Sequence, residues 1–119
     1  MKKILITGIA GFIGFHVAER LLARLIDTYL ASAAKLIAEG DEALAADDGA
    51  RLRRAAHTLK SSSANLGAAE LARRCAAVEQ MAREQRLVEA RGEWPAVVAE
   101  FQRVKRALRE LGKEPAAVH

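Results

Sequence analysis

The sequence is poor in cysteine, proline and aromatic residues, and each shortage excludes a class of protein. Its single cysteine, Cys75, excludes a disulfide framework and a cysteine-based zinc site, and is typical of a reducing compartment. Its two prolines and a charged fraction of 29% exclude a disordered low-complexity chain. The apolar stretch of residues 4–15 is far too short to span a bilayer, so we expect no membrane insertion.

Alanine and leucine are abundant instead, with 26 and 14 residues, whereas the aromatic residues make up 4% of the chain. Strong helix formers with few β-branched or aromatic residues favour helices that pack closely through small side chains. A length of 119 residues is enough for one domain with a modest core. The net charge of +4 is mild and its arginines are spread over several segments, so the charge does not indicate nucleic acid, which we do not expect as a partner. An acidic protein partner would suit this charge equally well.

Four stretches show the spacing of three and four residues that is typical of an amphipathic helix. The first begins near Phe15 and continues through an interior glycine, Gly40. Residues 47–49 (Asp-Asp-Gly) end it and supply the N-cap of a second helix, which closes at Gly67. The apolar positions of the first stretch are Leu22, Ile26, Tyr29, Leu30, Ala33, Leu36, Ile37 and Leu44.

The last two stretches follow Gly67 and are separated by a polar, arginine-bearing loop. Trp94 and Pro95 are expected to open the fourth helix, since proline is well placed in a first turn. The apolar positions are Leu71, Cys75, Val78 and Met81 in the third stretch, and Val97, Val98, Phe101, Val104, Leu108 and Leu111 in the fourth. Trp94 is predicted to join these core residues. Short connections predict an all-α, antiparallel four-helix bundle over residues 25–113, followed by a tail at residues 114–119.

Three glycines near the N-terminus, Gly8, Gly11 and Gly14, follow a predicted strand at residues 2–7 and precede a helix. Such glycines let the backbone approach a pyrophosphate at a helix N-terminus. The segment MKKILITGIAGFIGFHVAERLLAR resembles the start of an NAD-dependent nucleotide-sugar epimerase, an extended short-chain dehydrogenase. The rest of the chain has no second strand and no acid placed for the ribose. We therefore expect residues 1–24 to be a non-functional graft or a chimeric artefact without a cofactor.

The second predicted helix carries a histidine, His57, that lies outside its apolar stripe. His57 is two residues from both Ala55 and Leu59. This spacing is roughly 200° around a helix, so the side chain is expected to face solvent. A phosphoryl group on this imidazole would meet nearby positive charge, chiefly from Lys60. The positions that share its face are Arg53, Arg54, Lys60, Ser61 and Ala64.

The segment AHTLKSSSANLGA, which contains this histidine, resembles the signature of histidine-containing phosphotransfer (HPt) domains of bacterial phosphorelays. The residues that match the signature are His57, Leu59, Lys60 and Gly67. Ser61 stands where glycine is common in that family. The similarity extends over residues 25–111 and implies an antiparallel four-helix bundle of HPt type.

The resemblance also implies a role for each residue of the motif. His57 would be the phosphoacceptor and Lys60 would stabilise the phosphoryl group, while Leu59 and Gly67 would serve packing. The face that docks a partner would contain Arg53, Arg54, Ser61 and Ala64. The chain would be a carrier rather than an enzyme and would hold no metal or cofactor, because the partner receiver domain would supply the phospho-aspartate and Mg²⁺.

The same resemblance implies a biological setting. We expect a cytoplasmic phosphorelay intermediate that accepts a phosphoryl group from one receiver domain and passes it to another. Its partners would be response-regulator receiver domains and a hybrid sensor histidine kinase. It would be a monomer, or a dimer formed through the N-terminal strand or the first helix. Two alternatives stay open: a helical module that docks on a receiver domain without being phosphorylated, and a dinucleotide-binding fragment.

Overall fold

The computed structural model describes the backbone of residues 19–118 and the side chains of residues 21–111. This part of the chain consists of four helices and contains no strand. The helices are α2 (Glu19–Ala45), α3 (Gly49–Leu66), α4 (Ala69–Arg83) and α5 (Leu87–Val118). The predicted all-α fold is thus confirmed for the described residues, whereas the predicted strand and glycine loop at residues 2–14 lie outside them.

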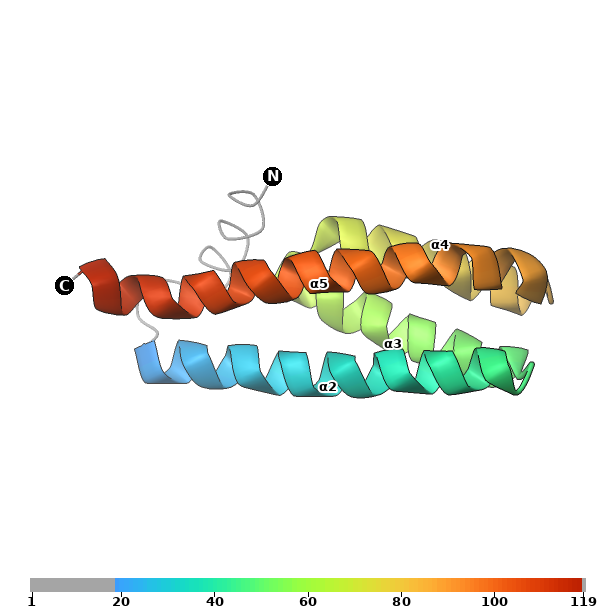
Figure 1. Cartoon of the computed structure of the whole chain (residues 1–119), viewed down its shortest axis with the longest axis horizontal. Coiled ribbons are helices and arrows are strands. Elements are labelled where there is room, and N and C mark those ends of the chain that lie inside the picture. The colour runs from blue at the N-terminus through green and yellow to red at the C-terminus, as the bar shows by residue number, and fades with distance from the viewer. Residues whose placement is uncertain (1–18, 119) are drawn as a thin grey trace.

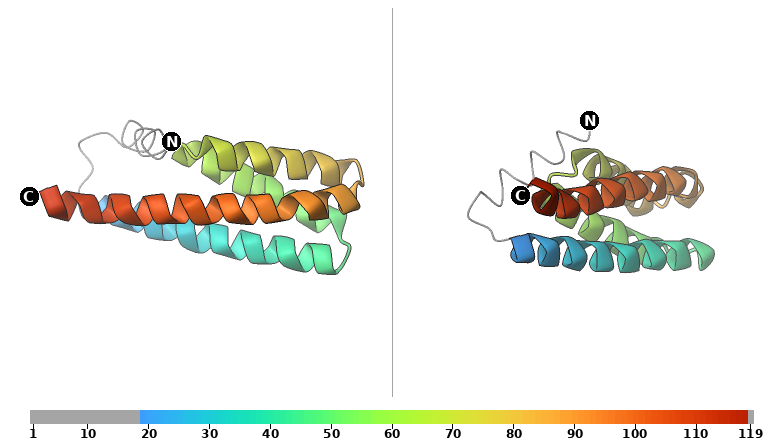
Figure 2. Two further views of the ribbon diagram at one scale, coloured as in Figure 1. Left: turned by 45° about the horizontal axis from the view of Figure 1, so that its top comes forward. Right: turned by 60° about the vertical axis from the view of Figure 1, so that its left-hand side comes forward.

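The four helices form an antiparallel bundle in which successive helices run in opposite directions (Figure 1). Helices α2 and α4 each pack against both α3 and α5. The shorter helices α3 and α4 lie side by side along one half of the longer pair, α2 and α5 (Figure 2). The connections that follow α2 and α4 therefore meet at the same end of the bundle.

The core consists of the apolar stripes of all four helices. Every apolar position that the sequence predicts for the first, third and fourth helices is either buried or packed against the buried cluster. Cys75, Trp94 and Phe101 belong to this core, as predicted. The side chains that are most completely enclosed include Leu52, Leu59, Leu71, Val78, Val97 and Leu108. Alanines supply much of the remaining contact, which allows the helices to approach closely.

Helix α3, which carries the histidine motif, is capped at both ends by predicted residues. At its start, the Asp48 side chain accepts a hydrogen bond from the backbone N–H of Arg51, at 3.1 Å. At its end, Gly67 adopts a left-handed conformation with φ 95°, and its N–H donates to the carbonyl of Ala64. Only glycine adopts this conformation without steric cost, so Gly67 fixes where α3 ends and α4 begins.

The start of the last helix corrects the sequence prediction. Helix α5 begins at Leu87, so Trp94 and Pro95 lie well inside it rather than in its first turn. The earlier turns are stabilised because Ala90 and Trp94 are buried in the core. Pro95 lacks an N–H and cannot donate a hydrogen bond to the carbonyl of Arg91. The burial of Ala90 and Trp94 offsets the loss of this bond. The predicted arginine-bearing loop is therefore only a short connection between Arg83 and Leu87.

The C-terminal end also differs from the prediction. The tail expected at residues 114–119 is helical through Val118, as a continuation of α5.

Gly40 shows why the first helix contains a glycine in its apolar stripe. Gly40 is buried in α2, and a Cβ at this position would overlap the indole ring of Trp94 from α5. The indole Nε1 donates a hydrogen bond to Oδ1 of the adjacent Asp41, at 2.7 Å. Gly40 therefore leaves the space in which the Trp94 ring packs against α2 and links α5 to it.

Candidate functional site

The exposed face of α3 presents His57. The opposite face of this helix is enclosed in the core through Leu52, Ala56 and Leu59. The His57 side chain is 57% exposed. Because the buried residues fix the rotation of α3, the imidazole points away from the core, as its spacing in the sequence predicts.

A buried carboxylate on α4, Glu79, connects this face of α3 to the neighbouring helix. The Glu79 side chain is only 6% exposed. Its Oε1 lies 2.7 Å from Lys60 Nζ, and its Oε2 lies 2.8 Å from His57 Nδ1 and 3.1 Å from Arg83 Nη2. Burial raises the pKa of this carboxyl, but hydrogen bonds from Lys60 and His57 outweigh it and hold the pKa below its usual value. Glu79 is therefore an anion at neutral pH.

The ionised carboxylate of Glu79 determines which ring nitrogen of His57 carries the proton and which one keeps its lone pair. A carboxylate accepts hydrogen bonds and donates none, so Nδ1 carries the proton in the contact with Glu79. In the neutral imidazole, the lone pair then belongs to Nε2. The geometry thus leaves a nucleophilic nitrogen on the exposed side of a ring whose other nitrogen is fixed.

Lys60 lies close to one helical turn after His57 and is bound to the same carboxylate. Its side chain is 33% exposed, and its ammonium donates to Glu79 Oε1 at 2.7 Å. An ammonium group has three N–H donors, so this contact leaves two of them for a further acceptor. The structure therefore brings His57 and Lys60 together through Glu79.

The serines that follow Lys60 differ in their surroundings. Ser63 is fully buried, and its Oγ forms a hydrogen bond of 2.9 Å with the hydroxyl of Tyr29 on α2. Ser62 is partly buried and donates to the carbonyl of Leu59 at 3.3 Å. Of these three serines, only Ser61 is exposed. This serine is thus the one that a partner surface could contact.

The other residues predicted for the site fall into two groups. Arg53, Arg54, Ser61 and Ala64 are exposed on α3, on the face that carries His57. Leu59 is completely buried, and Gly67 forms the C-cap of α3.

Glu79 and Arg83 belong to a different helix, α4, and the histidine motif does not predict them. A signal for Glu79 was present, because it directly follows Val78 and comes four residues after Cys75 in a buried stripe. A charged residue at such a position is expected to be paired, since an isolated buried charge is very costly. A second signal is α3 itself, which contains four cations and no acidic residue.

The described part of the chain shows neither a metal-ligand cluster nor a membrane-spanning helix. No group of three or more histidine, cysteine, aspartate or glutamate side chains is arranged to hold a metal ion in the residues that the structure describes. None of the described helices is both long and apolar enough to cross a membrane.

Comparisons with known proteins identify relatives of this bundle. Residues 24–113 match the family model described as the Hpt domain. The fold is also similar to the crystal structure of histidine-containing phosphotransfer protein B from Pseudomonas aeruginosa PAO1, with a TM-score of 0.74 and 28% sequence identity. That match covers 85% of this chain and 97% of the Pseudomonas chain. No curated protein matches the sequence.

The resemblance of residues 1–24 to an epimerase receives no support from these comparisons, since the family match begins at residue 24. Residues 1–18 lie outside the described part of the chain.

Proposed function

The chain belongs to the family of Hpt domains, the phosphotransfer carriers of two-component signalling, and we propose that His57 is the residue that carries the phosphoryl group. One contact supports this proposal more than any other. The Nδ1 of His57 is bonded to the buried carboxylate of Glu79 at 2.8 Å, while the ring itself is exposed. A histidine fixed in this way offers Nε2, and only Nε2, to a partner.

The proposed reaction is a direct displacement on phosphorus. The lone pair of His57 Nε2 attacks the phosphorus of a receiver-domain phospho-aspartate, and the bond between phosphorus and the aspartyl oxygen breaks. The electrons of that bond leave with the aspartate carboxylate. The phosphorylated ring retains its proton on Nδ1 and becomes cationic, and Glu79 stabilises this charge. Transfer to a second receiver domain reverses these steps, so the carrier needs no proton transfer.

Lys60 is proposed to bind the phosphoryl oxygens on His57. Its ammonium is held by Glu79 on the same side of α3 and is partly exposed. A fixed cation beside the transferred group offsets its negative charge. Mg²⁺ held by the receiver domain would supply further positive charge during transfer.

The partners are proposed to be response-regulator receiver domains and a hybrid sensor kinase, which meet the chain in the cytoplasm. The docking face would surround His57 and include Arg53, Arg54, Ser61 and Ala64. All four are exposed. Because Ser61 and Ala64 have small side chains, they allow the surface of a partner to approach the imidazole closely.

Transfer of label from a phosphorylated receiver domain to the full chain tests the proposal. The unaltered protein should become labelled, and His57→Gln should fold normally, since the side chain is largely exposed, yet accept no label. An acid-labile, alkali-stable adduct would identify a phosphoramidate. If His57→Gln still acquired label, another residue would be the acceptor. If the unaltered chain bound receiver domains without being labelled, it would be a docking module instead.

A further inference from the structure

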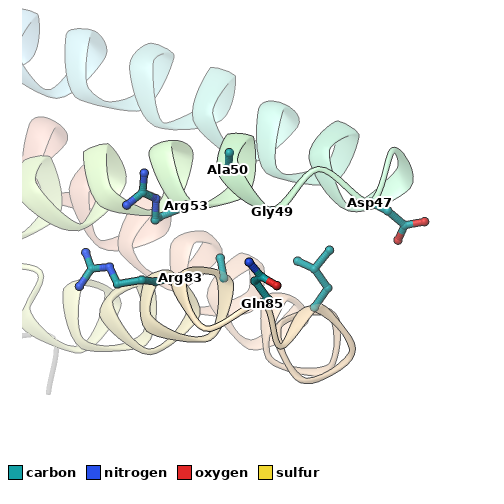
Figure 3. A pocket seen from close by; sticks show the side chains of 8 residues that line it. Asp47, Gly49, Ala50, Arg53, Arg83 and Gln85 are labelled. Atoms are coloured by element: carbon teal, nitrogen blue, oxygen red, sulfur yellow. The ribbon is translucent and has the colours of Figure 1, made fainter.

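A pocket of about 480 Å³ lies between α3 and α4, at the end of the bundle where the connections that follow α2 and α4 meet (Figure 3). Small and apolar side chains line part of it, among them Ala50, Ala82 and Leu87. Figure 3 shows Arg53 of α3 and Arg83 of α4 at the same end of this pocket, with Asp47 at the other. The arginine end is the one nearer to His57, because Arg53 lies between Gly49 and His57 along α3.

The arginine end of the pocket carries more positive charge than its surroundings neutralise. Arg53 is exposed, and it forms no ion pair within the part of the chain that the structure describes. Arg83 shares the single carboxylate of Glu79 with Lys60 and His57. The carboxylate at the opposite end, Asp47, is already paired with Arg91 at 2.9 Å.

The arginine end of the pocket lies close to the histidine site. Arg53 precedes His57 by four residues, which is about 6 Å along a helix. The guanidinium of Arg83 and the imidazole of His57 bind the same oxygen of Glu79. A protein that reaches His57 while burying a typical interface of about 800 Å² on each side would therefore also cover the arginine end of the pocket.

We propose that the pocket between Arg53 and Arg83 is a docking subsite for an acidic side chain of the receiver domain. This inference rests on the function proposed above, which makes a receiver domain the partner. The carboxylate of an aspartate or glutamate would lie between the two guanidinium groups. An apolar neighbour of that acid would pack against Ala50 and Leu87. The subsite would fix the orientation of the partner relative to His57 and accelerate its association.

Arg53→Glu tests this subsite, because Arg53, unlike Arg83, does not contact Glu79. The experiment measures phosphotransfer from a receiver domain that labels the unaltered chain, over a range of carrier concentrations and at two ionic strengths. Arg53→Glu should raise the half-saturating concentration roughly tenfold, because a like-charged pair replaces an attractive one. The maximal rate at saturation should stay within about twofold, and the difference should shrink at high salt.

Arg109→Glu is the matched control, since Arg109 is an exposed arginine on α5 and the change in net charge is the same. It should transfer almost as well as the unaltered protein. Equal effects of the two variants would mean that only the overall charge matters, and this would overturn the subsite. An unchanged half-saturating concentration for Arg53→Glu would also overturn the subsite. The same holds if only the maximal rate of Arg53→Glu falls. In each of these cases label still reaches His57, whereas failure of the proposed function would abolish labelling of the unaltered chain.

Discussion

At the scale of single residues, one carboxylate organises the proposed site. Glu79 is buried and binds His57, Lys60 and Arg83. A buried anion is stable only when it is paired, and three cationic or hydrogen-bonding partners satisfy that requirement here. The motif in the sequence predicts His57 and Lys60 but says nothing of Glu79, because the carboxylate reaches them from another helix.

Glu79→Gln should slow phosphoryl acceptance by about tenfold. The amide has nearly the same shape and can still accept from Nδ1, but it has no charge with which to stabilise the cationic ring. Hydrogen bonds to charged groups exceed neutral ones by about 1–1.5 kcal/mol, which corresponds to the tenfold effect. Single-turnover transfer from a phosphorylated receiver domain measures it. Glu84→Gln, an exposed carboxylate just after α4, is the control, and equal rates for both variants would mean that the charge of Glu79 is irrelevant to transfer.

Lys60→Ala should reduce the transfer rate roughly ten- to a hundredfold, because it removes one charge-assisted hydrogen bond of about 1.5–3 kcal/mol to the phosphoryl group. The helical content measured by circular dichroism should not change, since Lys60 lies outside the core. Lys35→Ala on α2 removes an exposed cation far from the motif in sequence and should leave transfer intact. A Lys60→Ala variant with the full rate would exclude Lys60 from phosphoryl binding.

At the scale of elements, apolar spacing predicts the helices well, and its failures have local causes. The N-cap at Asp48 and the left-handed C-cap at Gly67 are both confirmed, because these turns depend on short-range chemistry. The sequence pattern places the start of α5 too late, at Trp94 and Pro95 instead of Leu87. Proline is typical of a first turn, but Pro95 also fits inside this helix because the preceding turn is buried. The role of Gly40 is likewise hidden in the sequence, since it depends on Trp94, which is remote along the chain.

Gly40→Ala should destabilise the bundle by about 1–3 kcal/mol, although alanine normally favours a helix over glycine. The added methyl group would displace the Trp94 ring, which is packed between α2 and α5. Gly92→Ala on α5 is the matched control, because a Cβ there meets no atom within 4 Å. The control should stabilise the protein by up to about 1 kcal/mol. Urea denaturation measures both, and two stabilising substitutions would contradict the packing described here.

At the scale of the whole molecule, the proposed site exists only because two helices pack in one register. His57 and Lys60 belong to α3, whereas Glu79 and Arg83 belong to α4, and the Gly67 turn joins the two helices. Periodicity fixes which face of a helix is buried but not how far a neighbouring helix slides along it. This axial register follows from side-chain packing over the entire core. The sequence pattern therefore predicts the two residues on α3, whereas the two residues on α4 are known only from the structure.

The ion pairs of Glu79 should make the stability of the bundle sensitive to acid. The pKa of Glu79 in the folded protein is below its usual value of 4.5, so its contribution is complete above that value and is lost as pH falls through the folded pKa. Glu79→Gln lacks this contribution. The free energy of unfolding, measured in urea, should therefore differ between the two proteins above pH 4.5, and the difference should narrow as the pH falls below that value. A difference that is independent of pH would contradict the pairing.

The proposed mechanism requires that the phosphoryl group resides on Nε2 of His57. Nuclear magnetic resonance of the phosphorylated full chain, with nitrogen-15 in its histidines, tests this claim most directly, because coupling to phosphorus identifies the substituted nitrogen. We expect one phosphohistidine, with phosphorus coupled to Nε2 of His57 and a proton retained on Nδ1 beside Glu79. Coupling to Nδ1 instead, or an acid-stable phosphoryl group on Ser61, would contradict this mechanism.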